Sequence, residues 1–171
     1  MSANMQFRIG HGYDVHRFAA KAQADAHVTI GGVKITHTHT LLAHSDGDVL
    51  VHALCDALLG ALALGDIGRH FPDSDPRYRN CSSLVLLQHV LTLVRAEGWD
   101  VANADTTLVA QLPRFAPFVT AMRETLAGAM KVQVTQISVK ATTTEGLGFT
   151  GREEGLACNA VVLLQKNRVA E

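Results

Sequence analysis

The chain of 171 residues is 47% hydrophobic and carries a formal net charge of −1 at pH 7, values that suit one globular domain with a sizeable core. This charge excludes the strong basic field that binds a nucleic-acid backbone, and no apolar run is long enough to span a membrane. The three cysteines form no CxxC pair, so reduced thiols and a cytoplasmic location are expected. One domain is predicted over residues 1–171, with a disordered tail at residues 1–5 that lacks the apolar core of a signal peptide.

Hydrophobic patterning in the first half of the chain predicts a strand, a hairpin and a helix. Residues 6–12 alternate and predict a strand, and residues 28–35 predict a hairpin with Gly31-Gly32 as its turn. Residues 49–64 are rich in Leu and Ala, as in a buried helix. The preceding Ser45-Asp46-Gly47-Asp48 matches a capping-box pattern, in which Ser45 caps the helix.

The second half of the chain combines helices with strands. Helices are predicted at residues 82–97, followed by Gly98 as a C-cap, and at residues 116–130. Strands are predicted at residues 105–112, 137–142 and 157–165, with a glycine-rich loop at 145–155. This order of elements predicts an α/β or α+β fold in which helices cover one face of a single sheet.

Three residues of the first half suggest a metal site. Asp14 and His16 are two apart, so on an extended segment both side chains share a face. His52 lies in an apolar helix and must be hydrogen-bonded, metal-bound or neutral. One carboxylate and two imidazoles leave a coordination position open, as catalytic zinc requires. Asp56, one turn after His52, is expected to hold its second ring nitrogen. A hydrogen-bonded His–Asp pair in the core explains the same residues.

Polar segments at other positions are candidates for substrate contacts. A helix N-terminus favours an anion, so His44 and Ser45 could contact phosphate, although Ser45 could serve only as a cap. Carboxylates in Gly65-Asp66-Ile67-Gly68 and Phe71-Pro72-Asp73-Ser74-Asp75 could accept hydrogen bonds from sugar hydroxyls, and ordinary turn chemistry explains the same composition. Thr142-Thr143-Thr144-Glu145 offers hydroxyls to phosphate and a carboxylate to Mg²⁺, or is simply good strand sequence.

Taken in order, these segments resemble the 2-C-methyl-D-erythritol 2,4-cyclodiphosphate synthase family. Several gapped motifs in one order are far more specific than a single motif. The similarity runs from about residue 7 to about residue 164 and rests on Gly10-His11-Gly12-Tyr13-Asp14-Val15-His16, His44-Ser45-Asp46-Gly47-Asp48 with His52-Ala53 and Asp56-Ala57-Leu58, Gly65-Asp66-Ile67-Gly68 with Phe71-Pro72-Asp73, and Lys140-Ala141-Thr142-Thr143-Thr144-Glu145 with Gly148-Phe149-Thr150-Gly151-Arg152. Gly146 stands where many members have a lysine.

The resemblance implies a role for each matching residue. Asp14, His16 and His52 would bind zinc. His44 and Thr143 would stabilise the diphosphate in the transition state, and Glu145 would help to hold a second ion, Mg²⁺ or Mn²⁺. Substrate contacts would come from Ser45, Asp66, Gly68, Phe71, Asp73, Asp75, Thr142, Thr144, Phe149 and Arg152. The cytidine would be wrapped by Ala110, Gln111, Leu112, Pro113, Arg114, Phe115 and Ala116.

The resemblance also implies an assembly and a reaction. The fold would be an α+β sandwich with a single mixed sheet, in a homotrimer whose sheets surround the threefold axis and whose active sites lie between subunits. Arg152 and Glu154 would line an axial cavity for an isoprenoid or phosphate ligand. The enzyme would be a phosphorus–oxygen lyase of non-mevalonate isoprenoid biosynthesis. It would convert 4-diphosphocytidyl-2-C-methyl-D-erythritol 2-phosphate to 2-C-methyl-D-erythritol 2,4-cyclodiphosphate and release CMP. The attacking 2-phosphate is mostly dianionic at neutral pH and needs no general base.

Three other functions fit some of the same residues. A carboxylate and two histidines also form the facial triad of Fe(II) oxygenases, although those sites usually lie on β-barrels, whereas His52 lies in a predicted helix. A metal-dependent hydrolase would need a general base beside the metal, and no HExxH motif is present. A trimeric binding module without catalysis is the third alternative. Release of CMP from the cytidyl substrate would distinguish the synthase from all three.

Overall fold

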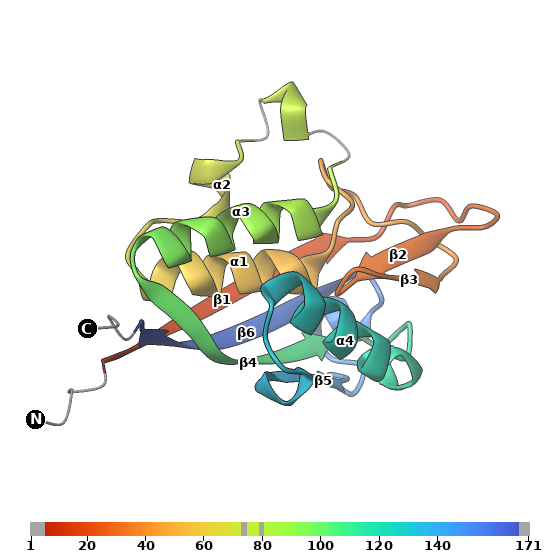
Figure 1. Ribbon diagram of the computed structural model, residues 1–171. Helices are drawn as coiled ribbons and strands as arrows, with labels where there is room; N and C mark the ends of the chain where they lie inside the picture. Colours follow the sequence, from red (N-terminus) through yellow and green to blue (C-terminus); the bar gives the residue numbers. More distant parts are fainter. Residues whose placement is uncertain (1–5, 73–74, 79–80, 168–171) are drawn as a thin grey trace, which may run out of the picture.

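The fold is built on a four-stranded mixed sheet, against which the long helices pack (Figure 1). The computed structural model describes residues 6–72, 75–78 and 81–167. The strand order is β1-β6-β4-β5, and only the β4–β5 pair is parallel. The strands are β1 (Phe7–Arg17), β4 (Trp99–Val109), β5 (Ile137–Thr142) and β6 (Gly155–Lys166). A mixed sheet was predicted, and it is confirmed.

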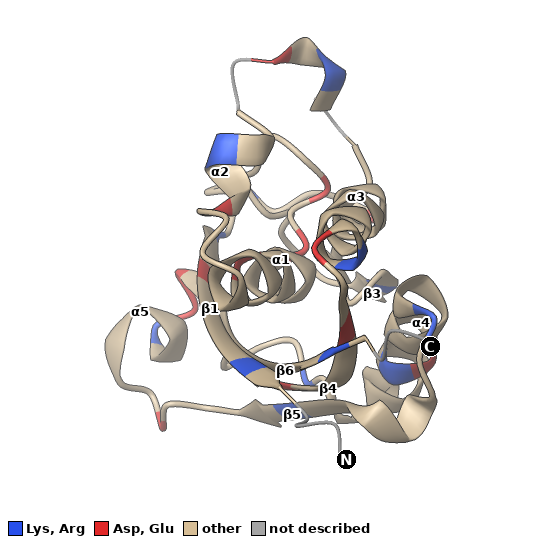
Figure 2. Cartoon of the chain, turned by 60° about the vertical axis from the view of Figure 1, so that its left-hand side comes forward, with Lys and Arg blue, Asp and Glu red and all other residues tan. Residues whose placement is uncertain are grey.

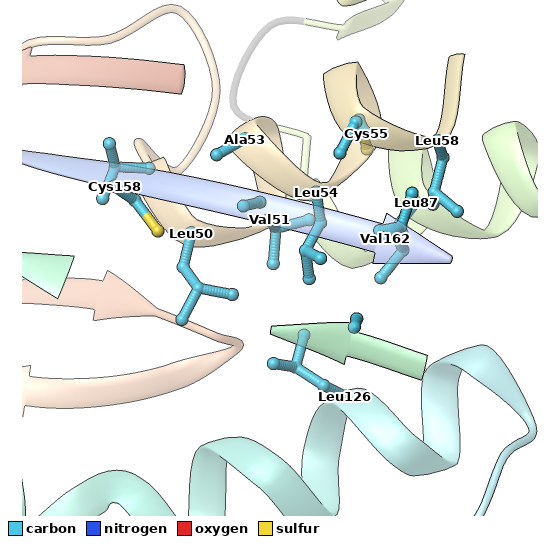
Figure 3. Close-up of a cluster of buried hydrophobic side chains, with 14 of the residues drawn as sticks. Leu50, Val51, Ala53, Leu54, Cys55, Leu58, Leu87, Leu126, Cys158 and Val162 are labelled. Carbon is cyan, nitrogen blue, oxygen red and sulfur yellow. The ribbon is translucent and has the colours of Figure 1, made fainter. Parts of the chain in front are cut away.

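Three helices cover the same face of this sheet: α1 (Val49–Ala61), α3 (Ser83–Ala96) and α4 (Val119–Met130). Figure 2 shows the sheet curving around α1. Burial alternates accordingly in the second half of β6, since Ala160 and Val162 are buried whereas Val161, between them, is 43% exposed. Figure 3 shows part of the core, in which side chains of α1 meet Leu87 of α3, Leu126 of α4 and Val162. The expected helices on one face are therefore found.

Two glycines allow α1 to lie directly on β1. A Cβ atom at Gly10 would stand 1.8 Å from the carbonyl oxygen of Ala57, and one at Gly12 would stand 2.0 Å from that of Ala53. No side chain fits at these distances, because real Cβ contacts are longer than 3.0 Å. The helix backbone therefore approaches the strand more closely than any other residue would permit. This approach sets the distance between side chains of α1 and those farther along β1.

The N-terminus of α1 differs from the prediction. Asp48, not Ser45, is the N-cap, and its Oδ1 accepts a hydrogen bond from Val51 N at 3.1 Å. The two oxygens of Asp48 also accept from the backbone N–H groups of Gly31 (2.8 Å) and Gly32 (2.7 Å). The expected capping box is wrong because Asp48 directly precedes the helix and reaches these three donors together. One buried carboxylate thus joins the hairpin turn to the helix.

The hairpin and the Gly98 cap match the prediction. The hairpin strands are β2 (His27–Ile30) and β3 (Val33–Thr36), and both turn glycines have positive φ, at 58° and 74°. Gly98 has φ of 76° directly after the C-cap Glu97, a conformation that favours glycine.

Several element boundaries differ from the prediction. β1 continues to Arg17 instead of ending at residue 12, and β4 begins at Trp99, because β6 pairs with both strands along their whole length. α1 ends at Ala61, and α4 begins at Val119 after a 3₁₀ turn, Ala116–Phe118. Short helices at α2 (Ile67–His70) and α5 (Gly148–Gly151) lie in predicted loops, with further 3₁₀ turns at Pro76–Tyr78 and Val134–Gln136. Nowhere in residues 6–72, 75–78 or 81–167 is there a helix with the length and apolar character to cross a membrane.

Candidate metal centre and adjoining cavity

Asp14, His16 and His52 converge on one point between β1 and α1. Asp14 and His16 lie on the helix-facing side of β1, and His52 faces them from the first turn of α1. His16 Nε2 lies 3.0 Å from His52 Nδ1, and Asp14 Oδ2 lies 3.1 Å from each of these nitrogens. The predicted convergence is therefore found, and it depends on the close approach at Gly10 and Gly12.

The donor set fits a divalent cation such as zinc. Zinc binds nitrogen and oxygen ligands at about 2.0–2.1 Å, so tetrahedral ligand atoms lie about 3.3 Å apart, close to the spacing of these three atoms. Two imidazole nitrogens and a carboxylate oxygen at such spacing cannot all be bare, because lone pairs would face one another. A proton or a cation has to lie between them. Among the described residues, this is the one group of three or more His, Cys, Asp or Glu side chains with metal-binding geometry.

The electrostatics of the cluster favour the charged carboxylate. Burial alone would raise the pKa of Asp14, but hydrogen bonds and charge from His16 and His52 outweigh it and hold this pKa well below its ordinary value. Burial lowers the pKa of His52, whereas its hydrogen bond to Asp14 and the nearby carboxylates raise it, and the net direction is upward. The protein therefore stabilises positive charge at the point where the three groups meet.

Asp56 was predicted to hold the second ring nitrogen of His52, and this prediction is wrong. Two serines lie beside that nitrogen instead. His52 Nε2 lies 2.8 Å from Ser83 Oγ and 3.2 Å from Ser45 Oγ. Asp56 instead accepts a hydrogen bond from Ile67 N at 2.7 Å, at the start of α2. The i, i+4 spacing along α1 suggested Asp56, but the ring nitrogen points toward the start of α3.

A cavity of about 650 Å³ opens beside the cluster, lined in part by His16 and His52. Other predicted substrate contacts line it too: His44, Ser45, Gly68, Phe71 and Asp75. The carboxylate of Asp75 is paired with Arg77 at 2.6 Å. Asp66 caps α2 by accepting from Arg69 N at 2.9 Å, as its turn interpretation predicts. Asp73 lies outside the described residues.

Several residues of this site were not predicted from the sequence. Leu42, Ala43, Ile67, Pro76, Tyr78 and Leu86 also line the cavity. Most of them are apolar side chains whose position only the fold reveals. Ser83 and Asp46 were assigned no role, although Asp46 lies within the matched motif. The only local signal for Ser83 is its place at the start of a predicted helix.

Most of the remaining predicted residues lie at the ends of β4 and β5, whereas Phe149 and Arg152 lie in and directly after α5, close to the start of β6. Residues 110–116 follow β4, and Ala110 N donates to Thr142 O at 3.1 Å. Thr143 Oγ1 donates to Glu145 Oε1 at 2.9 Å, and Thr144 Oγ1 lies 3.0 Å from Thr150 Oγ1. Phe149 lies in α5, directly before Thr150, and Arg152 follows that helix. The segment that follows β4 comprises Ala110, Gln111, Leu112, Pro113, Arg114, Phe115 and Ala116.

The residues at the ends of β4 and β5 do not meet the metal cluster within one chain. Across the sheet, Asp14 of β1 pairs with Cys158 of β6. Cys158 pairs with Leu108 of β4, and Leu108 pairs with Ala141 of β5. Both groups thus lie at the same end of the sheet, but β1 and β5 are its opposite edges, three strand spacings or about 14 Å apart. Arg152 pairs with Glu154 at 2.9 Å in the turn that leads into β6.

Comparison with known proteins identifies the family. The sequence model of the YgbB family matches residues 7–165. The 2-C-methyl-D-erythritol 2,4-cyclodiphosphate synthases of Azotobacter vinelandii and Pseudomonas syringae are 65% and 62% identical to the chain over 157 residues, which are 92% of this chain and 98% of each relative.

Solved structures agree with this match. The Plasmodium falciparum IspF–CDP complex has a TM-score of 0.83 at 32% identity, covering 97% of this chain and 100% of that one. The bifunctional IspDF of Campylobacter jejuni has a TM-score of 0.89 at 42% identity, covering 95% of this chain and 43% of that one. The resemblance that the ordered motifs indicated is confirmed, and the chain belongs to the YgbB family, together with these cyclodiphosphate synthases.

Proposed function

We propose that this protein catalyses the cyclodiphosphate-forming step of non-mevalonate isoprenoid biosynthesis, as its relatives are named to do. The substrate would be 4-diphosphocytidyl-2-C-methyl-D-erythritol 2-phosphate, and the products 2-C-methyl-D-erythritol 2,4-cyclodiphosphate and CMP. The observation that carries the proposal is the convergence of Asp14, His16 and His52 beside a cavity of about 650 Å³. Related structures that contain CDP support a cytidine diphosphate ligand.

Metal ions would be held at two places. A zinc ion on Asp14, His16 and His52 would supply a Lewis acid for a phosphoryl oxygen, and a second ion, Mg²⁺ or Mn²⁺, held with the help of Glu145, would neutralise charge between the phosphates. The three zinc ligands include a single carboxylate, so the site keeps net positive charge and suits a phosphate.

The chain's own residues would then act mainly by positioning. The attacking group is a phosphate dianion of the same substrate, so no residue has to remove a proton. Ser45 and His44 line the cavity next to the cluster and could donate hydrogen bonds to the diphosphate. Gly68 and Phe71 line the wall on which the methylerythritol unit would lie, and apolar Leu42 and Leu86 help to exclude water. Holding two phosphates in line accounts for most of the catalysis in such a transfer.

A homotrimer would complete the site. The sheet face that carries no helix exposes Phe7, Ile9, Tyr13, Val15 and Val161, and Ile9 is 72% exposed. His11 and Asn159 lie among these apolar side chains, and an exposed group of apolar residues of this kind is typical of an interface between proteins. Contact across it would bring the group at the ends of β4 and β5 of one subunit, including Thr143 and the cytidine segment, toward the metal centre of the next. Arg152 and Glu154 would then line the axial cavity, which would hold an isoprenoid or phosphate.

The proposal is tested by CMP release with zinc and Mg²⁺ present. The parent protein should form the cyclic diphosphate, and His52→Ala should lose both zinc and most turnover. His27→Ala is the matched control, because His27 is exposed on β2 and should retain both. Full zinc occupancy in His52→Ala would refute the ligand assignment. Activity only with Fe(II) and 2-oxoglutarate would favour an oxygenase, and a linear, hydrolysed product would favour a hydrolase.

A further inference from the structure

The ring nitrogen of His52 that faces away from Asp14 and His16 lies against Ser83, a serine that does not line the cavity. Ser83, the first residue of α3, is fully buried, and its Oγ lies 2.8 Å from His52 Nε2. Ser83 Oγ also donates a hydrogen bond to Asp46 Oδ1. We infer that Ser83 and Asp46 are positioning residues, which hold the His52 ring in the orientation and tautomer that a metal ion at Nδ1 requires.

The available protons decide the direction of each hydrogen bond in the series Asp46, Ser83 and His52. An ionised carboxylate only accepts, so the Ser83 hydroxyl donates its one proton to Asp46. The Ser83 oxygen can then only accept from His52. His52 Nε2 therefore carries a proton, which in a neutral imidazole leaves Nδ1 with a bare lone pair. Nδ1 is the nitrogen that faces Asp14 Oδ2 and His16 Nε2.

Backbone contacts hold Asp46 and Ser83 together independently of His52. Asp46 Oδ2 accepts from Ser83 N at 3.0 Å, and Asp46 N donates to Cys81 O at 3.3 Å. The N-cap of α3, Ser82, makes no side-chain capping bond, so Asp46 satisfies the first N–H group of α3 in its place. The loop before α1 and the start of α3 are thus joined directly behind His52, and the acceptor for Nε2–H is fixed.

Ser45 and Ser83 have different surroundings. Ser45 Oγ is the more distant partner of His52 Nε2, at 3.2 Å, and Ser45 lines the cavity. Ser83 is closer and enclosed by protein, so substrate cannot displace it. An acceptor behind a metal-binding histidine typically changes metal affinity by about 10–100-fold, because it orients the ring and raises its basicity.

The inference rests on the zinc site of the proposed function, and zinc affinity tests it without an activity assay. Zinc would be titrated against a chromophoric chelator for the parent protein, Ser83→Ala and Asp46→Asn. Ser83→Ala should bind zinc about 10–100-fold more weakly. Ser82→Ala is the matched control, since the neighbouring Ser82 is exposed and its side chain makes no capping bond, and its affinity should equal that of the parent. An unchanged affinity in Ser83→Ala would overturn the inference.

The double variant distinguishes positioning from mere helix capping. If Asp46 acts on His52 only through Ser83, the combined variant should lose little more zinc affinity than the more affected single variant. Independent structural roles would instead give additive losses. Melting of the metal-free proteins separates a general loss of stability from a loss of affinity.

A measurement on the unaltered protein does not depend on any variant folding. Nitrogen-15 NMR of the zinc-loaded parent should show His52 bound through Nδ1, with a slowly exchanging proton on Nε2. Zinc bound through Nε2, or a rapidly exchanging Nε2 proton, would contradict the inference. A parent protein that takes up no zinc would overturn both this inference and the proposed function, whereas normal uptake with an unaffected Ser83→Ala variant would overturn the inference alone.

Discussion

Replacing Gly12 with alanine should separate the two elements that form the metal centre. The new Cβ atom would stand 2.0 Å from the carbonyl oxygen of Ala53, and both partners are backbone-bound, so neither can rotate away. Reaching even a tight contact requires α1 and β1 to move apart by about 1 Å, several times the tolerance of about 0.2 Å in metal–ligand distances. His52 moves with α1, while Asp14 and His16 stay on β1. Overpacking of this kind costs about 1–3 kcal/mol or more of the free energy of unfolding.

Gly128→Ala is the control for this variant. Gly128 lies in α4, where an added Cβ would meet nothing within 4 Å, and alanine should stabilise the helix by about 0.5–1 kcal/mol. Urea unfolding would measure stability, and metal analysis with CMP release would measure the site. Gly12→Ala should lose stability, zinc and turnover together. A Gly12→Ala variant that binds a full equivalent of zinc and unfolds at the urea concentration of the parent would show that this close approach does not set the site.

Three further predictions concern single side chains. Thr143→Ala should lower kcat and leave zinc content unchanged, because Thr143 lies outside the metal cluster; an unaltered kcat in CMP release would remove its assigned role. Burial raises the pKa of Asp48 to about 6, above the ordinary 3.8. The folded state then keeps a proton that the unfolded state releases. Between about pH 4 and 6 the parent should therefore lose stability relative to Asp48→Asn as the pH rises. A pH-independent difference between the two proteins in urea unfolding would contradict this. Burial also raises the pKa of the Cys55 and Cys158 thiols, so a thiol reagent should modify only Cys81 in the folded protein, and fast modification in Cys81→Ser would be the contrary result.

Local patterns predicted those parts of the structure that neighbouring residues control. The hairpin with Gly31-Gly32, strand β5 and the body of α1 follow from turn chemistry and periodicity, which act over a few residues. The period of two in a strand placed Asp14 and His16 on one face. Motif order along the chain indicated the family, which the comparisons confirm.

Long-range contacts decided the rest, because residues far apart in sequence leave no local signal. Ser83 is 31 residues from His52, and only the packing of α3 on α1 brings them together. Asp48, which caps α1, also accepts hydrogen bonds from two N–H groups of the distant hairpin turn. Strand order places Asp14 and Thr143 at opposite edges of the sheet, which no motif spacing could predict. Composition and local patterns thus establish which chemical groups the protein possesses, whereas strand pairing and helix packing, which depend on the whole chain, establish which of these groups meet.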